Sequence, residues 1–441
     1  MNEPIDTFFN PAVFQNLSVY RDTVSSGPAK TVRQIIMNWS GPGSSVHQEG
    51  MFAGLFFELA FRAEERQGTQ VGNMWQDFLL ESIIMSENPF TRMASAGQIN
   101  GGSHLGTAVK KAAAEDLGLL KALFDIDFNR FNTDPGIYSD LLTHQPGGED
   151  SPPPPGGPQY EIHAIKTKLL ASRDWSDAAD LLADFHLRCG FGDFCRYHAF
   201  RWDGINKALK GISNPDPIRL ENLVGYENQR QSIIENTKLL LEGLPAGNIL
   251  LYGDRGTGKS STVKALIHRF GAYGLRIIEV PRDFIGDYPE IVSAVERTGL
   301  KFIFFVDDLS FEDRETEYKA FKSFLEGGLQ AKPGNIAVYA TSNRRHIIKE
   351  SFEDRHSGIG NSDTLQEKLS LSDRFSTTLL FLSPDQELYL KIVEGLARQR
   401  GLSVPPGELR LRALEWERWN NSRSGRTASQ FIDHLWALQG K

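Results

Sequence analysis

Cysteine is scarce in this sequence: Cys189 and Cys195 are the only two among 441 residues. So few thiols exclude the disulfide framework that stabilises many small secreted domains. The opening residues, MNEPIDTFFNPAVF, place no basic segment ahead of an apolar one, so they do not predict a secretory signal. These two absences lead us to expect a cytoplasmic protein.

Long apolar runs are missing as well. The longest apolar stretch, MFAGLFFELAF at residues 51–61, contains Glu58. It is shorter than the roughly 20 apolar residues that a membrane-spanning helix needs, so it predicts a buried helix and no membrane span.

Basic residues are outnumbered by acidic ones. The chain has 48 Lys and Arg against 56 Asp and Glu, which gives a formal net charge of −8 at pH 7. Constitutive, non-specific binding to nucleic acid depends on a basic surface, so this balance argues against it. A local basic face would still be compatible with the balance.

The first half of the chain has a mainly helical pattern. Apolar residues recur at three- and four-residue spacings in residues 51–67 and 107–128. Four consecutive prolines at 152–155 lack backbone donors and favour an extended chain, so they predict a solvated loop or linker. We therefore predict a helical N-terminal region over residues 1–143, a Pro- and Gly-rich loop or linker over 144–160, and a continuing helical segment over 161–215.

Five short apolar runs follow residue 215, and amphipathic segments separate the earlier ones. Continuous apolar strands that alternate with helices predict an α/β fold, with a parallel sheet covered on both faces. We place an αβα domain with a five-stranded parallel sheet at residues 216–383 and a small helical domain at 384–441. The five runs are NILLY (248–252), LRIIEV (275–280), FIFFV (302–306), NIAVYA (335–340) and TTLLFL (377–382).

The first of these runs leads into GDRGTGKSS at residues 253–261, which matches the phosphate-binding pattern G-x-x-x-x-G-K-[ST]. Glycines allow backbone N–H groups to turn toward phosphate oxygens, and the following helix presents its N-terminus to the anion. Lys259 would reach the β and γ phosphates, and the Ser260 hydroxyl would be a ligand of Mg²⁺. The glycine spacing differs from the dinucleotide fingerprint G-x-G-x-x-G, which argues against NAD.

Two acids, Asp307 and Asp308, end the apolar run at residues 302–306. Ligands of a doubly wound sheet bind beyond the carboxyl ends of its strands, where a Mg²⁺ on Ser260 would also lie. We assign Asp307 to the metal side, through a bound water, and Asp308 to orienting and polarising the attacking water.

Three further polar positions follow at later points of the chain. The next apolar run ends in a polar group that includes Asn343, and a polar side chain there can hold the attacking water or contact the γ phosphate. Arg374 precedes the last run, in a segment that we expect at the surface. Arg426 lies at a predicted helix start, where a cation is unfavourable, so we expect an anionic partner for it.

The ordered set LVGYENQ, GDRGTGKSS, FIFFVDDLSF, VYATSNRRH, LSLSDRF and SGRTASQF resembles the AAA+ ATPases. In detail the chain is similar to a bacterial AAA+ family recorded as domain of unknown function 815, strongly over about residues 215–441 and more loosely over the helical front half. The resemblance implies a P-loop NTPase αβα domain with a C-terminal helical lid, and ATP and Mg²⁺ as cofactors. It also implies a homo-oligomeric ring, such as a hexamer, that acts on an unidentified protein or nucleic-acid client.

The resemblance implies roles for single residues as well. Asn343 takes the sensor 1 position, Arg374 is the arginine finger that would reach a neighbour's site, and Arg426 is the sensor 2 arginine of the lid. Val224 and Gly225 would lie against the adenine. The residues of the phosphate loop would be Gly253, Asp254, Arg255, Gly256, Thr257, Gly258, Lys259, Ser260 and Ser261.

Two departures from the family pattern leave alternatives open. AAA+ proteins usually follow the metal acid with glutamate, whereas this chain has Asp308. A slow nucleotide-dependent switch that recruits partners is therefore the alternative to an ATP-driven machine. Arg344 and Arg345 follow the sensor 1 position, so the assignment of the finger to Arg374 is not unique. A small-molecule kinase fits less well, because it has no use for a sensor asparagine together with a finger.

Four metal-type side chains, His186, Cys189, Cys195 and His198, fall within thirteen residues with the spacing H-x₂-C-x₅-C-x₂-H. Soft ligands in such a group could hold zinc. Their surroundings are predicted to be helical, and two core thiols with two imidazoles at the edge of the core explain the pattern as well.

Overall fold

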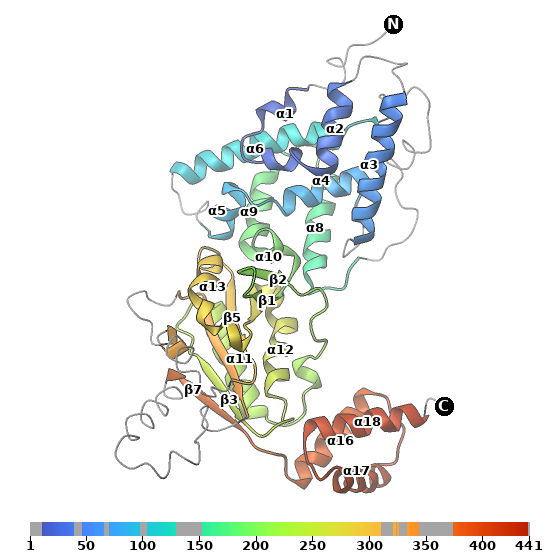
Figure 1. Cartoon of the computed structure of the whole chain (residues 1–441), viewed down its shortest axis with the longest axis vertical. Helices are drawn as coiled ribbons and strands as arrows, with labels where there is room; N and C mark the ends of the chain where they lie inside the picture. Colours follow the sequence, from blue (N-terminus) through green and yellow to red (C-terminus); the bar gives the residue numbers. More distant parts are fainter. Residues whose placement is uncertain are drawn as a thin grey trace. The chain divides into compact units, whose positions relative to one another are not determined.

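A computed structural model describes residues 11–38, 46–65, 70–97, 104–128, 152–309, 321–322, 324–325, 333–343 and 374–439. The chain divides into two compact units (Figure 1). The first unit contains Met1–Tyr197 together with Arg297–Leu300, and the second contains His198–Glu296 and Lys301–Lys441.

The described part of the first unit consists of helices around one apolar core. Two tryptophans anchor this core, because each is buried and donates its indole N–H to a carbonyl oxygen: Trp75 to Leu123 at 2.8 Å and Trp175 to Leu169 at 2.9 Å. The helices are α1 (Val13–Asn16), η2 (Arg21–Val24), α2 (Gly27–Met37), α3 (Val46–Glu65), α4 (Met74–Ile84), α5 (Pro89–Ser95), α6 (His104–Phe124), α8 (Pro158–Ala171), α9 (Ala178–Cys189) and α10 (Asp193–Arg196).

The helices expected from residues 51–67 and 107–128 correspond to α3 and α6. The proline-rich segment is shorter than expected, since α8 begins at Pro158, inside the predicted loop 144–160. Proline suits the first turn of a helix, where its missing N–H would have no partner. The described residues 152–157 are neither helix nor strand.

The second unit is built on a sheet with the order β2-β1-β4-β5-β6-β3-β7, which has seven strands among the described residues. All five predicted strands are present, and they pair in parallel with one another. The strands are β1 (Ala199–Asp203), β2 (Ala208–Gly211), β3 (Ile249–Gly253), β4 (Leu275–Glu279), β5 (Lys301–Val306), β6 (Ile336–Ser342) and β7 (Thr377–Phe381).

The prediction of a five-stranded sheet is therefore wrong by two strands, and residues 161–215 are not helical throughout. β1 and β2 form an antiparallel hairpin, and β1 also pairs in parallel with β4, with Ala199 opposite Ile277. The hairpin was missed because its strands are short and β2 is polar and partly exposed, so no apolar run marks it.

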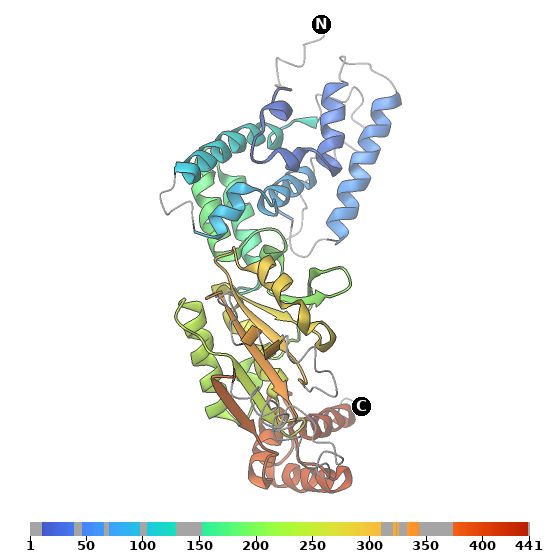
Figure 2. The same cartoon turned by 60° about the vertical axis from the view of Figure 1, so that its left-hand side comes forward.

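Helices cover both faces of the sheet, as the αβα prediction requires (Figures 1 and 2). On β5, Ile303 and Phe305 pack with α11 and α12, whereas Phe304 stacks on Tyr288 at the start of α13 with ring centroids 5.6 Å apart. The helices of the αβα domain are η4 (Leu220–Asn222), α11 (Glu227–Leu241), α12 (Lys259–Phe270), η5 (Gly271–Tyr273), η6 (Arg282–Asp287) and α13 (Tyr288–Val295).

A C-terminal lid of three helices follows β7, as predicted. α16 (Gln386–Gln399), α17 (Pro406–Asn420) and α18 (Gly425–Gln439) enclose a core of their own, which includes Tyr389 and Phe431.

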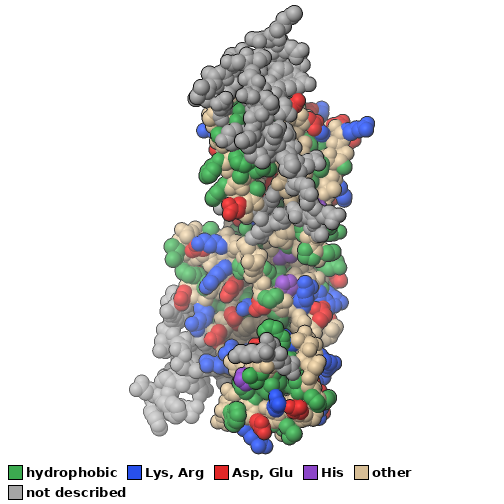
Figure 3. Space-filling view, turned by 90° about the vertical axis from the view of Figure 1, so that its right-hand side faces the viewer, with side chains coloured by type: hydrophobic (Ala, Val, Ile, Leu, Met, Phe, Trp, Pro, Cys, Tyr) green, Lys and Arg blue, Asp and Glu red, His purple; other side chains and the backbone are tan. Residues whose placement is uncertain are grey.

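Across the described residues, no helix combines the length and the apolar character needed to cross a bilayer. Figure 3 shows Lys and Arg side chains interspersed with Asp and Glu over the described residues of one face.

Candidate nucleotide-binding site

The strand order brings β3, β5 and β6 next to one another with their carboxyl ends at the same edge of the sheet. A pocket of about 720 Å³ lies beyond this edge, where α/β folds bind their ligands. The lining residues are Ile218, Asn222, Leu223, Val224, Gly225, Tyr226, Arg230, Arg255, Gly256, Thr257, Gly258, Lys259, Ser260, Ser261, Thr262, Asp307, Asp308, Thr341, Asn343, Ile392, Leu396, Gly425, Arg426 and Ser429.

The phosphate loop owes its shape to glycines with left-handed backbones. Gly253, Gly256 and Gly258 have φ values of 127°, 73° and 89°, which side chains other than glycine rarely tolerate. A Cβ on Gly253 would also lie 2.1 Å from the carbonyl oxygen of Phe381. α12 then begins at Lys259 directly after Gly258, so its N-terminus faces the pocket.

The Lys259 side chain is hydrogen-bonded to the phosphate loop and to Asn343. Its Nζ donates to the carbonyl oxygens of Gly253 at 2.9 Å and Asp254 at 2.6 Å, and to Oδ1 of Asn343 at 3.2 Å. Burial lowers the pKa of Lys259, and the nearby carboxylate of Asp254 acts in the opposite direction. The lysine thus joins the phosphate loop to the sensor 1 position.

Oxygen atoms suited to magnesium meet between the phosphate loop and β5. The Ser260 hydroxyl donates to Oδ1 of Asp307 at 2.6 Å, and the Thr341 hydroxyl donates to the same oxygen at 2.6 Å. Hydroxyl and carboxylate oxygens are hard ligands, and Mg²⁺ is commonly bound through one or two carboxylates together with waters and phosphate oxygens. Ser260 and Asp307 therefore fit the predicted metal site.

The backbone leaves the extended conformation of β5 at Asp308. Its φ is 54°, in the left-handed region, and its backbone N–H donates to the Thr341 hydroxyl at 2.9 Å. The side-chain amide of Asn343 donates to Oδ1 of Asp308 at 2.6 Å. The two residues expected to hold the attacking water are thus bonded to each other.

An apolar wall lines the other end of the pocket. Val224 and Gly225, the residues expected against the adenine, line the pocket there. Gly225 has a φ of 82°, and a Cβ on it would meet Leu388 of the lid. Ile392 and Leu396 of α16 complete the wall. Aliphatic side chains in a pocket wall suit the flat, apolar faces of a purine base.

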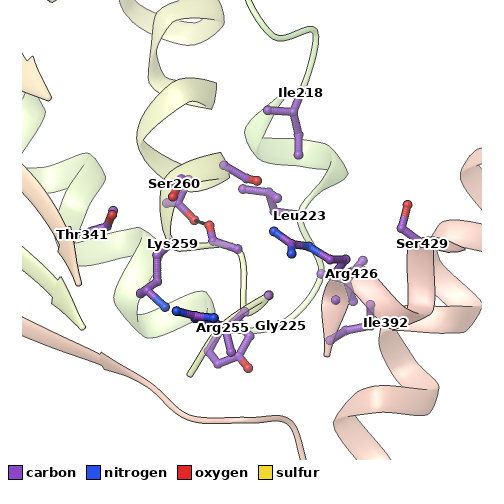
Figure 4. A pocket seen from close by; sticks show the side chains of 18 of the residues that line it. Ile218, Leu223, Gly225, Arg255, Lys259, Ser260, Thr341, Ile392, Arg426 and Ser429 are labelled. Carbon is purple, nitrogen blue, oxygen red and sulfur yellow. Dashed lines mark hydrogen bonds between the residues drawn. The ribbon is translucent and has the colours of Figure 1, made fainter. Parts of the chain in front are cut away.

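Two arginines add positive charge to this cavity. Arg255 of the phosphate loop and Arg426 of the lid both line the pocket, where Figure 4 shows their side chains together with that of Lys259. The backbone N–H of Arg426 donates to the carbonyl oxygen of Gly256 at 3.4 Å, so the start of α18 lies against the phosphate loop. A polyanionic ligand would supply the anionic partner expected for Arg426.

The side chain of Asp254 does not line the pocket, in contrast to those of Arg255, Lys259 and Ser260. Its Oδ2 accepts the backbone N–H of Ser383 at 2.6 Å, and the hydrogen bonds from Ser383 lower the pKa of Asp254. The Tyr226 hydroxyl donates to the carbonyl oxygen of Leu382 at 2.6 Å, and burial raises the pKa of Tyr226 to about 12. Both contacts tie the connection between β7 and the lid to the nucleotide pocket.

Arg374 does not line the pocket of its own chain. It is exposed and precedes the amino end of β7, whereas the phosphate loop follows the carboxyl end of the parallel strand β3. The competing Arg344 and Arg345 lie outside the described residues. Arg374 therefore lies near the amino-end edge of the sheet, opposite the edge where the pocket is, and its assignment as an arginine finger stays a prediction.

Two of the four candidate zinc ligands, His186 and Cys195, contact the backbone carbonyl of Gly190. His186 is buried, its Nδ1 lies 2.8 Å from the carbonyl oxygen of Gly190, and burial lowers its pKa to about 4. The Cys195 thiol donates to the same oxygen at 3.0 Å. In the part of the chain that the structure describes, no group of three or more His, Cys, Asp or Glu side chains could hold a metal ion.

Some pocket residues were not among the sequence predictions. Thr341 was visible only as one of several polar residues at a strand end. Arg230, whose guanidinium donates to the carbonyl oxygen of Gly225, had no sequence signal, because an arginine on an amphipathic helix is usually solvated. Ile392 and Leu396 of the lid have the pattern of ordinary core residues, so only the fold shows that they face the pocket.

A phosphate loop after β3, two acids after β5 of the same parallel sheet and a C-terminal helical lid define a P-loop protein of the AAA+ class. The chain belongs to the family described as "Protein of unknown function (DUF815)", whose model matches residues 195–439, more than half of the sequence.

Several curated proteins are similar to part of the chain. The proteasome-activating nucleotidase of Methanothermobacter thermautotrophicus is 28% identical over 172 residues, 33% of this chain and 42% of that protein. The nucleotidase of Methanosarcina mazei is 29% identical over 156 residues, 30% of this chain and 37% of that protein. The chain thus spans about two fifths of the length of these relatives. Among solved structures, the Thermotoga maritima RuvB Holliday junction branch migration motor is 12% identical, with a TM-score of 0.33, and the match covers 50% of this chain and 72% of that one.

Proposed function

We propose that this protein is a cytoplasmic ATPase that hydrolyses ATP with Mg²⁺ to drive conformational change or remodelling of a macromolecular partner. One observation carries the proposal: hydrogen bonds connect Lys259 to Asn343 and Asn343 to Asp308, beside the Ser260–Asp307 pair, within a single pocket. Phosphate contact, metal site and water-activating residues are thus adjacent.

Each residue has a distinct role in the proposed reaction. Lys259 leaves the carbonyl oxygens that it now contacts and neutralises the β and γ phosphates. Ser260 and Asp307 would hold Mg²⁺, which neutralises charge on the phosphate oxygens when bound. Asp308 accepts a hydrogen bond from the attacking water and polarises it, while the Asn343 amide fixes the Asp308 carboxylate. Arg426 would bring the lid onto the phosphates.

The proposal includes a homo-oligomeric ring, such as a hexamer, in which Arg374 of one subunit completes the site of the next. Its support is the position of Arg374, which is exposed and outside its own pocket. The client would be a protein or a nucleic acid. The relatives named proteasome-activating nucleotidase make a protein client the first to test.

A second candidate function is a slow nucleotide-dependent switch that recruits partners. It is favoured by the aspartate at position 308. The side chain of Asp308 is shorter than that of the usual glutamate, and its carboxylate already accepts a hydrogen bond from Asn343. The two functions share the pocket and differ in the rate of hydrolysis.

The decisive experiment compares Lys259→Ala with Lys264→Ala. Both lysines lie on α12, but Lys264 does not line the pocket. ATP at a hundred times its dissociation constant should stabilise the wild-type fold by about 2.7 kcal/mol. We expect thermal unfolding to show this stabilisation in the Lys264→Ala protein and not in the Lys259→Ala protein.

Phosphate release should likewise be retained in the Lys264→Ala protein and lost in the Lys259→Ala protein. If wild-type protein shows neither an ATP-dependent shift in unfolding temperature nor phosphate release, the proposed function is wrong. Binding without measurable release would favour the switch.

A further inference from the structure

We propose that Thr341 is a positioning residue for both acids of the site, and that its hydroxyl makes tight Mg²⁺ binding and hydrolysis possible. The proposal rests on the proposed function and concerns a residue to which the sequence motifs assign no role.

Thr341 lies opposite the acids across the β5–β6 pair. Val306 pairs with Ala340, so the next residues along the two parallel strands are Asp307 and Thr341. Thr341 is 3% exposed, and it lines the pocket. Its place in the sheet is fixed by pairing with Leu251 of β3 on the other side.

Three hydrogen bonds join Thr341 to the segment of the acids. Its hydroxyl donates to Oδ1 of Asp307 at 2.6 Å and accepts the N–H of Asp308 at 2.9 Å. Its carbonyl oxygen accepts the N–H of Leu309 at 2.7 Å. The hydroxyl thus acts as donor to one acid and as acceptor for the backbone of the next.

These bonds matter because the two acids need different orientations. A carboxylate that is held by a fixed donor presents its other lone pairs to a metal in one orientation, and loss of such outer partners weakens metal sites. At Asp308 the left-handed backbone, with a φ of 54°, directs the N–H to the Thr341 hydroxyl. Without that acceptor, a half-buried N–H would lose its partner and the turn would lose a restraint.

The test uses full-length protein with three substitutions. Thr341→Val removes the hydroxyl at nearly constant volume, and Thr341→Ser keeps the hydroxyl. Ser342→Ala is the matched control, because Ser342 is the adjacent buried hydroxyl of β6 and does not line the pocket. For each protein, the dissociation constant of ADP is measured with Mg²⁺ and with EDTA, and phosphate release from ATP is measured separately.

We expect Thr341→Val to bind ADP in EDTA like the wild type, because the phosphate loop and the base wall are intact. The enhancement of ADP binding by Mg²⁺, and the turnover, should fall roughly tenfold to a hundredfold. Thr341→Ser should recover most of both quantities, and Ser342→Ala should retain both. If Thr341→Val binds no ADP in EDTA, Thr341→Ala removes the same hydroxyl without placing a methyl group near Asp307 and takes its place.

An unchanged Mg²⁺ enhancement and turnover in the hydroxyl-free variant would overturn the role of Thr341 while leaving the proposed function standing. Equal losses in Thr341→Val and Ser342→Ala would also overturn it, since they would report general damage to β6. Failure of the proposed function is distinguishable, because wild-type protein would then bind no nucleotide.

Discussion

At the scale of single residues, the backbone at position 308 favours the aspartate found there. A φ of 54° is uncommon outside glycine, and aspartate and asparagine adopt this region several times more readily than most other residues. The carboxylate of Asp308 also has the length that lets it accept the Asn343 amide at 2.6 Å. The shorter acid thus matches the local turn, and a glutamate would strain both the backbone and this contact.

We therefore predict that Asp308→Glu lowers the rate of phosphate release by about tenfold, since one tenfold step corresponds to about 1.4 kcal/mol of lost transition-state stabilisation. Steady-state release under saturating ATP measures this effect. Asp308→Asn is the companion variant, because asparagine tolerates the same backbone but carries no charge. It should bind ATP and release almost no phosphate. A large acceleration by Asp308→Glu would contradict the prediction and identify the native protein as a switch.

The site was predictable from the sequence wherever a residue type is required by chemistry at a fixed spacing. Lys259, Ser260 and Asp307 belong to this group, and the structure brings them together. Thr341 and Arg230 were not predictable, because a threonine at a strand end and an arginine on a helix have many ordinary roles. Asp254 has the loop position of a phosphate-binding residue, but its side chain is bonded to Ser383.

At the scale of elements, the β1–β2 hairpin is tied to the segment η6 that follows β4. The Trp202 indole donates to Oδ2 of Asp287 at 2.8 Å, and Lys207 pairs with the same carboxylate. Gly204 packs against Phe284, whose ring would be 2.0 Å from a Cβ at position 204. The hairpin therefore holds η6 in place at the edge of the sheet.

This packing predicts that Gly204→Ala lowers the free energy of unfolding by about 1–3 kcal/mol, the usual cost of overpacking. Chemical denaturation followed by circular dichroism measures the change. Gly286→Ala is the matched control in the same region, since a Cβ there would meet nothing within 4 Å. It should change stability by less than about 0.5 kcal/mol. Equal effects of the two substitutions would show that the Gly204–Phe284 contact has no special weight.

Helices and strands, like single residues, were predictable where the sequence carries a local pattern and were missed where it does not. The five strands beneath the nucleotide pocket are buried or largely apolar, and the lid helices α16 and α18 have clear amphipathic patterns, so these elements were visible in the sequence. β2 alternates between exposed and partly exposed residues. Its position depends on pairing with β1, a tertiary interaction that local pattern does not encode.

At the scale of the whole molecule, the proposed ring makes Arg374 essential to a site in another subunit. An arginine finger contributes roughly 10³–10⁵ in rate. We predict that Arg374→Ala abolishes phosphate release and leaves ATP binding intact, and that wild-type activity rises with protein concentration. Arg418→Ala, which removes an exposed arginine of α17 outside the pocket, should leave both unchanged.

Mixing two inactive variants tests the arrangement directly. A Lys259→Ala subunit keeps its Arg374, and an Arg374→Ala subunit keeps its nucleotide pocket. Together they should recover a fraction of wild-type phosphate release that neither has alone. If mixing restores nothing and turnover does not depend on concentration, Arg374 does not act between subunits.

The four residues Arg297–Leu300 make the first compact unit discontinuous in sequence. They lie between α13 and β5 in sequence, yet they belong to the first compact unit, where the N–H of Gly299 donates to the carbonyl oxygen of Ser95 at 2.8 Å. The polypeptide therefore passes between the units three times, at residues 197, 296 and 300. A chimera that exchanged only residues 1–197 with a relative would leave a fragment of the old unit behind. Recombination at a single junction could not transfer the front half whole, so the two halves are expected to be inherited together.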